Sequence, residues 1–190
     1  MNDILGILFK ISKNNQKNIG SHGFDHTLRV IKLCVFLGNK LGANMDILIP
    51  AAILHDISRS EENHAKVGSE KSREILREQS LDEEIINLIC EVIESHSFSA
   101  KKEPKSLEAK ILSDADKLDA LGAIGIYRTA AYSFENSKKM ENFISHFNEK
   151  LLKLKDQMYT DEAYKIALSR HNYMEDYLKR ITDEIGLKDV

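Results

Sequence analysis

The sequence predicts an all-α protein that folds as a compact helical bundle. Its 190 residues include only two prolines and nine glycines, so few positions would interrupt a helix. Apolar residues recur three and four positions apart over most of the chain, which is the periodicity of helices with one buried face. The length predicts a single domain over residues 1–190, in which helices within residues 138–190 close the bundle.

Composition excludes several classes of protein. Hydrophobic residues make up 42% of the sequence and charged residues 30%, a balance typical of soluble globular proteins rather than disordered ones. The net charge of −3 provides no basic field for a nucleic-acid scaffold. No apolar run is long enough to span a membrane, and no signal peptide is recognisable at the start of the sequence. We therefore expect a cytoplasmic protein whose cysteines, Cys34 and Cys90, serve as small apolar residues.

The first two predicted helices bring a histidine and an arginine to the same edge. Residues 3–13 are expected to form a short amphipathic helix, and a longer helix is expected within residues 21–41, with Asp25 in its first turn or as its cap. His26 and Arg29 are three residues apart, so they share the inward-facing edge of the second helix. An arginine at that edge requires an anionic partner.

The apolar run from Leu48 to Leu54 predicts a buried helix that Pro50 opens near its start. His55 and Asp56 follow directly at the end of this run. A buried charge without a partner is costly, so the pair is either exposed at the helix end or satisfied by other groups in the fold.

Two further histidines belong to predicted helices. Residues 64–79 are expected to form a charged helix that begins with His64. The next helix carries an apolar stripe over residues 85–92 that continues to His96, so this histidine reaches the buried face. Beside a metal ion, His96 would be a candidate ligand or acid.

Residues 106–121 are expected to form a helix with an unusual density of carboxylates. Asp116 and Asp119 share one face, whereas Asp114 lies about 200° away from Asp116 around the helix. Aspartates have low helix propensity and repel one another, so a bound cation would resolve this conflict.

The rest of the chain is expected to complete the bundle. Glycines within residues 122–125 allow a close approach between helices. After a polar loop at residues 133–137, two amphipathic helices are expected at about 139–158 and 161–185.

Three of these helices supply a mixed set of nitrogen and oxygen ligands, which suits Mn²⁺, Fe²⁺, Co²⁺, Ni²⁺ or Zn²⁺ better than Ca²⁺. We expect a divalent metal cofactor, with Mn²⁺ favoured and Mg²⁺ retained as an alternative. Such an ion lowers the pKa of water and polarises a phosphoryl oxygen, so hydrolysis of a phosphate ester or anhydride by metal-activated water is the natural reaction. The four candidate ligands are His26, His55, Asp56 and Asp116.

Other polar residues are candidates for catalysis and phosphate binding. Asp56 is a candidate catalytic residue as well as a ligand, and His64 or His96 could protonate a leaving group, because an imidazole titrates in the useful range. The alternative for each cation is a solvated surface charge. The candidate phosphate-binding residues are Arg29, Arg59, Lys117 and Arg128.

The order His, His-Asp, Asp in an all-helical pattern resembles the HD-domain superfamily of metal-dependent phosphohydrolases, and in particular its small stand-alone bacterial and archaeal members. The resemblance implies a bundle of the HD-domain type, a metal held by the four ligands above, and a small phosphorylated substrate, with nucleotides as the first candidates. It is compatible with a monomer or a homodimer. The matching segments are 22–30, 54–57, 95–99, 108–125 and 146–151.

Several reactions remain open within and beyond this superfamily. Some relatives carry a catalytic glutamate three residues after the His-Asp pair, where this chain has Arg59. That difference disfavours a monophosphatase mechanism and favours binding of more than one phosphate, as in release of pyrophosphate from a nucleoside triphosphate. The alternatives are a phosphodiesterase, an oxygen-using enzyme with two irons, and a non-catalytic metal- or nucleotide-binding regulatory module. The intact ligand set argues for catalysis, because a binding module needs no open metal position.

Overall fold

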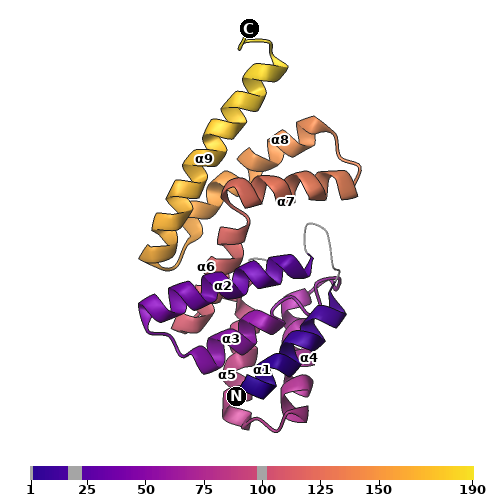
Figure 1. The fold of residues 1–190 in the computed structure, drawn as a ribbon, viewed down its shortest axis with the longest axis vertical. Helices are drawn as coiled ribbons and strands as arrows, with labels where there is room; N and C mark the ends of the chain where they lie inside the picture. Colours follow the sequence, from indigo (N-terminus) through magenta and orange to yellow (C-terminus); the bar gives the residue numbers. More distant parts are fainter. Residues whose placement is uncertain (1, 17–22, 98–101) are drawn as a thin grey trace. The chain divides into compact units, whose positions relative to one another are not determined.

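The computed structural model describes residues 2–16, 23–97 and 102–190 (Figure 1). These residues form helices and turns without strands, which confirms the all-α prediction. The fold divides into two compact units, residues 1–116 and 117–190. The organisation as a single domain stays a prediction, and the matching segments 22–30 and 95–99 lie partly outside the described residues. No helix among the described residues is long and apolar enough to cross a lipid bilayer.

The first unit is built around α3, whose residues after Asp46 are apolar on every side, as expected for a helix enclosed by others. It packs against α1, α2 and α5, while α4 packs against α5. The approach of α2 to α3 depends on Gly38, since a Cβ atom there would lie 2.7 Å from a side-chain atom of Leu48. Cys34 and Cys90 are buried free thiols. The helices are α1 (Asn2–Asn15), α2 (Phe24–Leu41), α3 (Met45–Leu54), α4 (His64–Glu78), α5 (Glu83–Ser95) and α6 (Leu107–Asp119), whose last residues belong to the second unit.

The prediction that Pro50 opens this helix is wrong, because α3 begins at Met45 and contains Pro50 in its interior. The side chain of Asn44 caps the helix by accepting a hydrogen bond from the backbone N–H of Asp46 at 3.0 Å. The ring of Pro50 leaves the Asp46 carbonyl without its usual helical donor. Asp46 is exposed, so solvent can satisfy that carbonyl.

Two long-range hydrogen bonds position α6 in the first unit. The side chain of Glu108 accepts from the backbone N–H of Asn44 at 2.8 Å, at the start of α3. The hydroxyl of Ser113 donates to the backbone carbonyl of His96 at 2.9 Å, at the end of α5. Hydrogen bonds therefore hold α6 against α3 at Glu108 and against α5 at Ser113. Asp116 follows Ser113 by one helical turn, so these contacts position it.

In the second unit, α7 packs against α8 and α9, and the 3₁₀ helix η2 packs against the same two helices. The expected single helix over 139–158 is wrong, because Lys150 leaves helical geometry with φ −132° and ψ −59°. The turn that follows buries Leu151 and Leu154. The elements are α7 (Gly122–Glu135), α8 (Met140–Glu149), η2 (Leu151–Gln157) and α9 (Asp161–Ile185).

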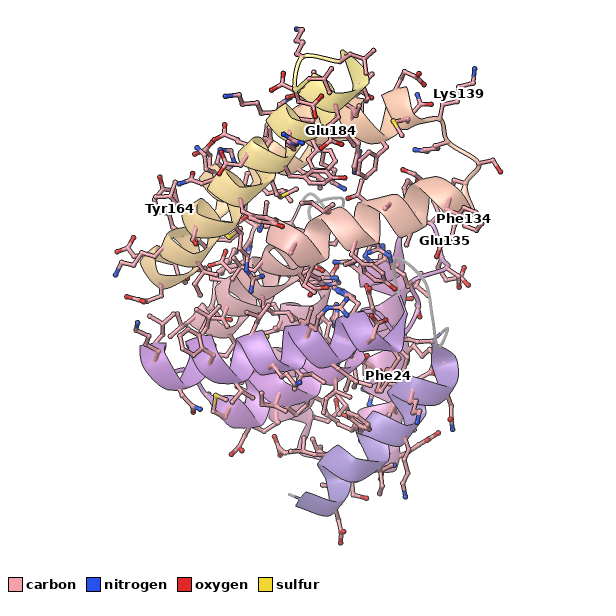
Figure 2. The ribbon with its side chains drawn as sticks, turned by 45° about the horizontal axis from the view of Figure 1, so that its top comes forward. Phe24, Phe134, Glu135, Lys139, Tyr164 and Glu184 are labelled. Carbon is pink, nitrogen blue, oxygen red and sulfur yellow. The ribbon has the colours of Figure 1, made fainter. Side chains whose placement is uncertain are left out.

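The turn between α6 and α7 requires both of its glycines. Gly122 has a φ of +72°, and a Cβ atom on Gly125 would lie 2.2 Å from the carbonyl oxygen of Ala120. The polar loop predicted at 133–137 is shorter than expected, because α7 continues to Glu135. Figure 2 shows Phe134 at this end of α7, where its side chain is 88% exposed.

Candidate metal centre

The end of α3 places His55 and Asp56 in the core. The last carbonyl groups of a helix have no partner within it, and here other groups supply the donors. The His55 imidazole donates through Nδ1 to the carbonyl of Ala52 at 2.9 Å, and the hydroxyl of Ser12 donates to the carbonyl of Ile53 at 2.6 Å. The His-Asp pair is therefore buried, which excludes the alternative of an exposed pair at the helix end.

A chain of hydrogen bonds connects the helix that carries His26 to the same end of α3. Thr27 donates to the side-chain carbonyl of Gln16 at 2.8 Å, and the amide of Gln16 donates to the hydroxyl of Ser12 at 3.0 Å. Ser12 in turn donates to Ile53, as described above. The sequence patterns that indicate the ligands do not indicate these three supporting residues. The available signal was that Ser12 and Gln16 are four residues apart at the end of the first predicted helix, a spacing that brings two polar side chains to the same side.

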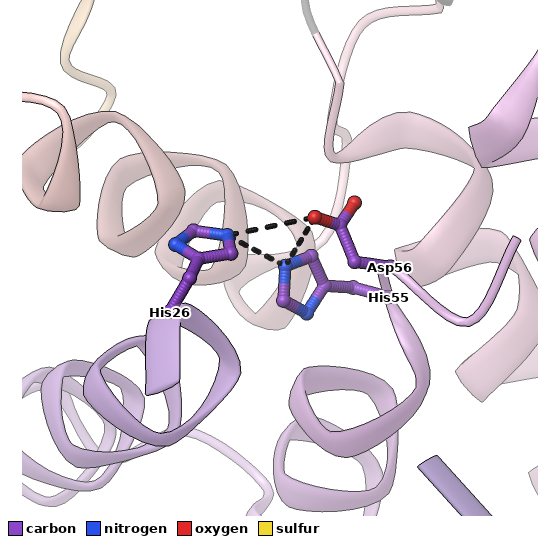
Figure 3. Close-up of side chains that lie close together, drawn as sticks. All are labelled: His26, His55 and Asp56. Atoms are coloured by element: carbon purple, nitrogen blue, oxygen red, sulfur yellow. Dashed lines mark hydrogen bonds and ion pairs between the residues drawn. The ribbon is translucent and has the colours of Figure 1, made fainter. Parts of the chain in front are cut away.

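The four candidate ligands converge in the first unit, and Figure 3 shows three of them, His26, His55 and Asp56. His26 Nε2 lies 3.3 Å from His55 Nε2, 3.6 Å from Asp56 Oδ2 and 3.3 Å from Asp116 Oδ1. His55 Nε2 lies 3.8 Å from Asp56 Oδ2. The side chains are buried except for that of Asp116, which is 29% exposed and gives the cluster an open side.

The chemistry of these donors fits a divalent ion. Because His55 donates through Nδ1, its Nε2 carries the lone pair and faces His26. Ligand atoms at about 2.1 Å from one ion lie roughly 3.0–3.5 Å apart, close to the separations in this cluster. Asp56 Oδ1 is buried and has no hydrogen bond among the described residues, as expected of a carboxylate arranged around a cation.

The second oxygen of Asp56 faces two other histidines. His64 Nε2 and His96 Nε2 each lie 3.9 Å from Asp56 Oδ1. His96 donates through Nδ1 to the carbonyl of Ile93, so its buried Nε2 also carries a lone pair. Arg59 lies one turn after Asp56 and donates through Nη1 to His64 Nε2 at 3.0 Å.

Burial and charge set the protonation states in the cluster. Burial lowers the pKa of His55, His64 and His96 below the ordinary value of 6.5. Burial alone would raise the pKa of the Asp56 carboxyl, but His55, Arg59 and His26 hold it below its ordinary value. Neutral imidazoles and ionised carboxylates are the forms that bind a metal ion.

These shifts predict how the stability of the metal-free protein depends on pH. The unfolded histidines take up protons as pH falls through about 6.5, whereas the buried ones resist, so stability is present above that value and is lost as pH falls further. Urea unfolding with a chelator should therefore give a smaller free energy of unfolding at about pH 5.5 than at about pH 7.5. The difference in the free energy of unfolding between the two pH values should be smaller in His96→Gln, because the glutamine amide does not titrate. Equal values at both pH values would contradict this account.

The remaining candidate cations have partners elsewhere. Arg29 pairs with Asp25 one turn earlier on α2 at 2.5 Å, which supplies the anion expected for it. In the second unit, the ammonium of Lys117 lies over the ring of Tyr159, 4.6 Å from its centroid. Phosphate binding by these residues stays a prediction. The other candidate phosphate-binding residue in that unit, Arg128, donates to Asp119 at 3.0 Å.

This chain is similar to known proteins both in sequence and in structure. The sequence model of the family described as HD domain matches residues 23–121. YpgQ of Bacillus subtilis is 33% identical over 175 residues, covering 86% of this chain and 84% of YpgQ. The crystal structure of YpgQ in complex with ADP superposes with a TM-score of 0.82 and 26% identity, over 95% of this chain and 97% of YpgQ.

This chain is also similar to a second solved structure and to part of a larger nuclease. The structure of an HD-superfamily hydrolase from Bacillus thuringiensis superposes with a TM-score of 0.76 and 32% identity, over 97% of this chain and 96% of that protein. Ribonuclease Y of Thermotoga maritima is 28% identical over 160 residues. That alignment covers 80% of this chain but only 27% of the ribonuclease.

Proposed function

This chain belongs to the HD-domain family of metal-dependent phosphohydrolases, and we propose that it hydrolyses nucleotides, releasing pyrophosphate from a nucleoside triphosphate. The observation that carries the proposal is the convergence of two imidazole nitrogens and two carboxylate oxygens in one buried cluster with an open side. The nucleotide is supported by the ADP bound to YpgQ, a relative that superposes along nearly its whole length.

His26, His55, Asp56 and Asp116 would hold the metal ion. A divalent ion in this position supplies a Lewis acid that makes water a better nucleophile and polarises a phosphoryl oxygen. The protein keeps the ligands in the required state, because the backbone carbonyl of Ala52 fixes the tautomer of His55. The partial exposure of Asp116 leaves a route by which a phosphate group can approach.

His64 and His96 would handle the proton of the attacking water. Burial lowers the pKa of both, so each imidazole is neutral near neutral pH and ready to accept a proton. His96 is the better acceptor, since its Nε2 has no hydrogen bond among the described residues, whereas His64 Nε2 accepts from Arg59. The accepted proton can then pass to the departing phosphate oxygen, which is the acid role expected of these histidines.

Arg59 would bind a phosphate group beside the metal cluster. Its side chain is 36% exposed, and its guanidinium lies 3.5 Å from Asp56 Oδ1, so the positive charge lies beside the metal cluster at a position that a substrate phosphate can approach. A permanent positive charge here favours substrates with more than one phosphate. The same charge would stabilise pyrophosphate as it departs.

The test is a panel of nucleoside mono-, di- and triphosphates incubated with metal-stripped protein to which Mn²⁺, Mg²⁺, Co²⁺ or Ni²⁺ is added. We expect metal-dependent release of pyrophosphate, together with the monophosphate, from triphosphates. Release of inorganic phosphate alone would contradict the proposed bond cleavage. Tight metal binding without turnover of any compound would favour the regulatory module.

Phosphodiester hydrolysis is the second candidate, favoured by the similarity to ribonuclease Y over 80% of this chain. Both reactions require the same ligands, so the residues alone do not distinguish them. A linear phosphodiester such as bis-p-nitrophenyl phosphate therefore belongs in the same panel. Turnover of the diester in the absence of any turnover of triphosphates would replace the first candidate with this one.

A further inference from the structure

The side of Asp56 that faces away from His26 forms a second set of metal-type donors. Asp56, His64 and His96 each offer one ligand atom within 4.8 Å of the others, and Asp56 Oδ1 lies 3.9 Å from Nε2 of both histidines. A carboxylate with two imidazoles is a donor set that divalent ions accept. Asp56 Oδ1 and His96 Nε2 are both buried and without hydrogen bonds among the described residues. Buried acceptor atoms that lack a hydrogen bond and lie close together are stabilised by a nearby positive charge.

Arg59 places its guanidinium at this second set. Its Nη1 donates to His64 Nε2 at 3.0 Å and lies 3.5 Å from Asp56 Oδ1. The hydrogen bond uses the lone pair with which His64 would bind a metal ion. The backbone holds Arg59 in this position, because its N–H donates to the carbonyl of Asp56 at 3.1 Å in the turn that follows α3.

A guanidinium and a second metal ion cannot share these donors. Both would require the lone pair of His64 and the same oxygen of Asp56, and two cations so close together repel each other strongly in a buried setting. Arginine stays protonated at every pH at which a protein is folded, so its charge does not depend on conditions. A lysine at position 59 would keep the positive charge, although its ammonium group differs in shape from a guanidinium.

We propose that Arg59 takes the place of a second metal ion and restricts the chain to one divalent ion, held at the His26 side of Asp56. The inference rests on the proposed function, because it presupposes a metal ion at the first set of ligands. It adds that the residue three positions after the His-Asp pair determines how many ions bind. In this account His64 and Asp56 Oδ1 form a receptor for the guanidinium, and His96 remains available for proton transfer.

The test counts ions in the whole protein after equilibrium dialysis against Mn²⁺, with protein and metal measured separately. We expect one ion per chain in the unmodified protein and in Arg59→Lys, and two in Arg59→Met, which removes the charge without adding a ligand. The double variant Arg59→Met, His64→Ala should return to one. Arg77→Met is the matched control, because Arg77 is an exposed arginine of α4, and it should stay at one.

A spectroscopic measurement gives an independent readout. Two Mn²⁺ ions that share a carboxylate are magnetically coupled, so Arg59→Met should lose the simple six-line electron paramagnetic resonance pattern of one isolated ion. Arg59→Gln serves as a second neutral variant, and circular dichroism checks that each variant is folded.

The outcomes separate this inference from the proposed function. One ion in both the unmodified protein and the folded neutral variants would overturn the role of Arg59 and leave the first metal position intact. Two ions in the unmodified protein would overturn it as well, because the guanidinium would then exclude nothing. No ion in the unmodified protein would remove the proposed metal centre and this inference with it.

Discussion

Asp56→Asn is expected to abolish metal binding and to lower turnover by roughly 10³-fold or more. Asp56 presents one oxygen 3.6 Å from His26 Nε2 and the other 3.9 Å from His64 and His96. The amide of asparagine has the same shape but no charge, and its NH₂ group cannot bind a metal ion. The substitution therefore replaces an anionic ligand that has two oxygens with a neutral one that has a single oxygen, and it removes no volume from the core. Metal content after dialysis and initial rates with the best substrate of the panel are the measurements.

The matched control for this prediction is Glu91→Gln, which removes one carboxylate from an exposed position on α5. Its metal content and turnover should equal those of the unmodified protein. Circular dichroism should show the same helical content in both variants. If Asp56→Asn retained its metal ion and its activity, the assignment of Asp56 to the metal centre would be wrong.

Asp119→Ala is expected to destabilise the second unit by about 3–5 kcal/mol. The carboxylate of Asp119 is buried and receives a hydrogen bond from the nearly buried guanidinium of Arg128 at 3.0 Å. Removing the anion leaves a buried cation without this partner, and the desolvation cost of that cation is no longer offset. The sequence has no tryptophan, so unfolding is best followed by circular dichroism of the helices in urea.

The control is Glu184→Gln, which breaks the ion pair between Glu184 and Arg180 on the exposed surface of α9. That change should cost no more than about 1 kcal/mol, because solvent screens an exposed pair. Adding Arg128→Met to Asp119→Ala should recover much of the lost stability, because it also removes the buried positive charge that had faced Asp119. A cost for Asp119→Ala no larger than that of the control would mean that the buried pair contributes little.

The helical architecture was predictable because apolar periodicity is a local property of the sequence. The boundaries of α2 and α4 follow the expected ranges closely. The errors occur where a local pattern competes with tertiary packing. Lys150 is a good helix former, yet the helix ends there because the following turn buries Leu151 and Leu154.

The candidate site was predictable as a list of residues but not as an arrangement. Spacing placed His26 and His96 on inward faces, and both are buried. It also predicted an anionic partner for Arg29, which the structure provides as Asp25. No local pattern indicates that Arg59 would contact His64, because that contact depends on how the turn after α3 meets the start of α4.

The sequence by itself determined the helical class of the fold and the chemical types available to the site, because both follow from side-chain identity and short-range periodicity. Only the tertiary structure decided what each donor faces. The two oxygens of Asp56 point to different groups of histidines, since Oδ2 lies near His26 and Oδ1 lies near His64 and His96. These choices depend on contacts between residues far apart in the chain, and those contacts exist only after the helices have packed.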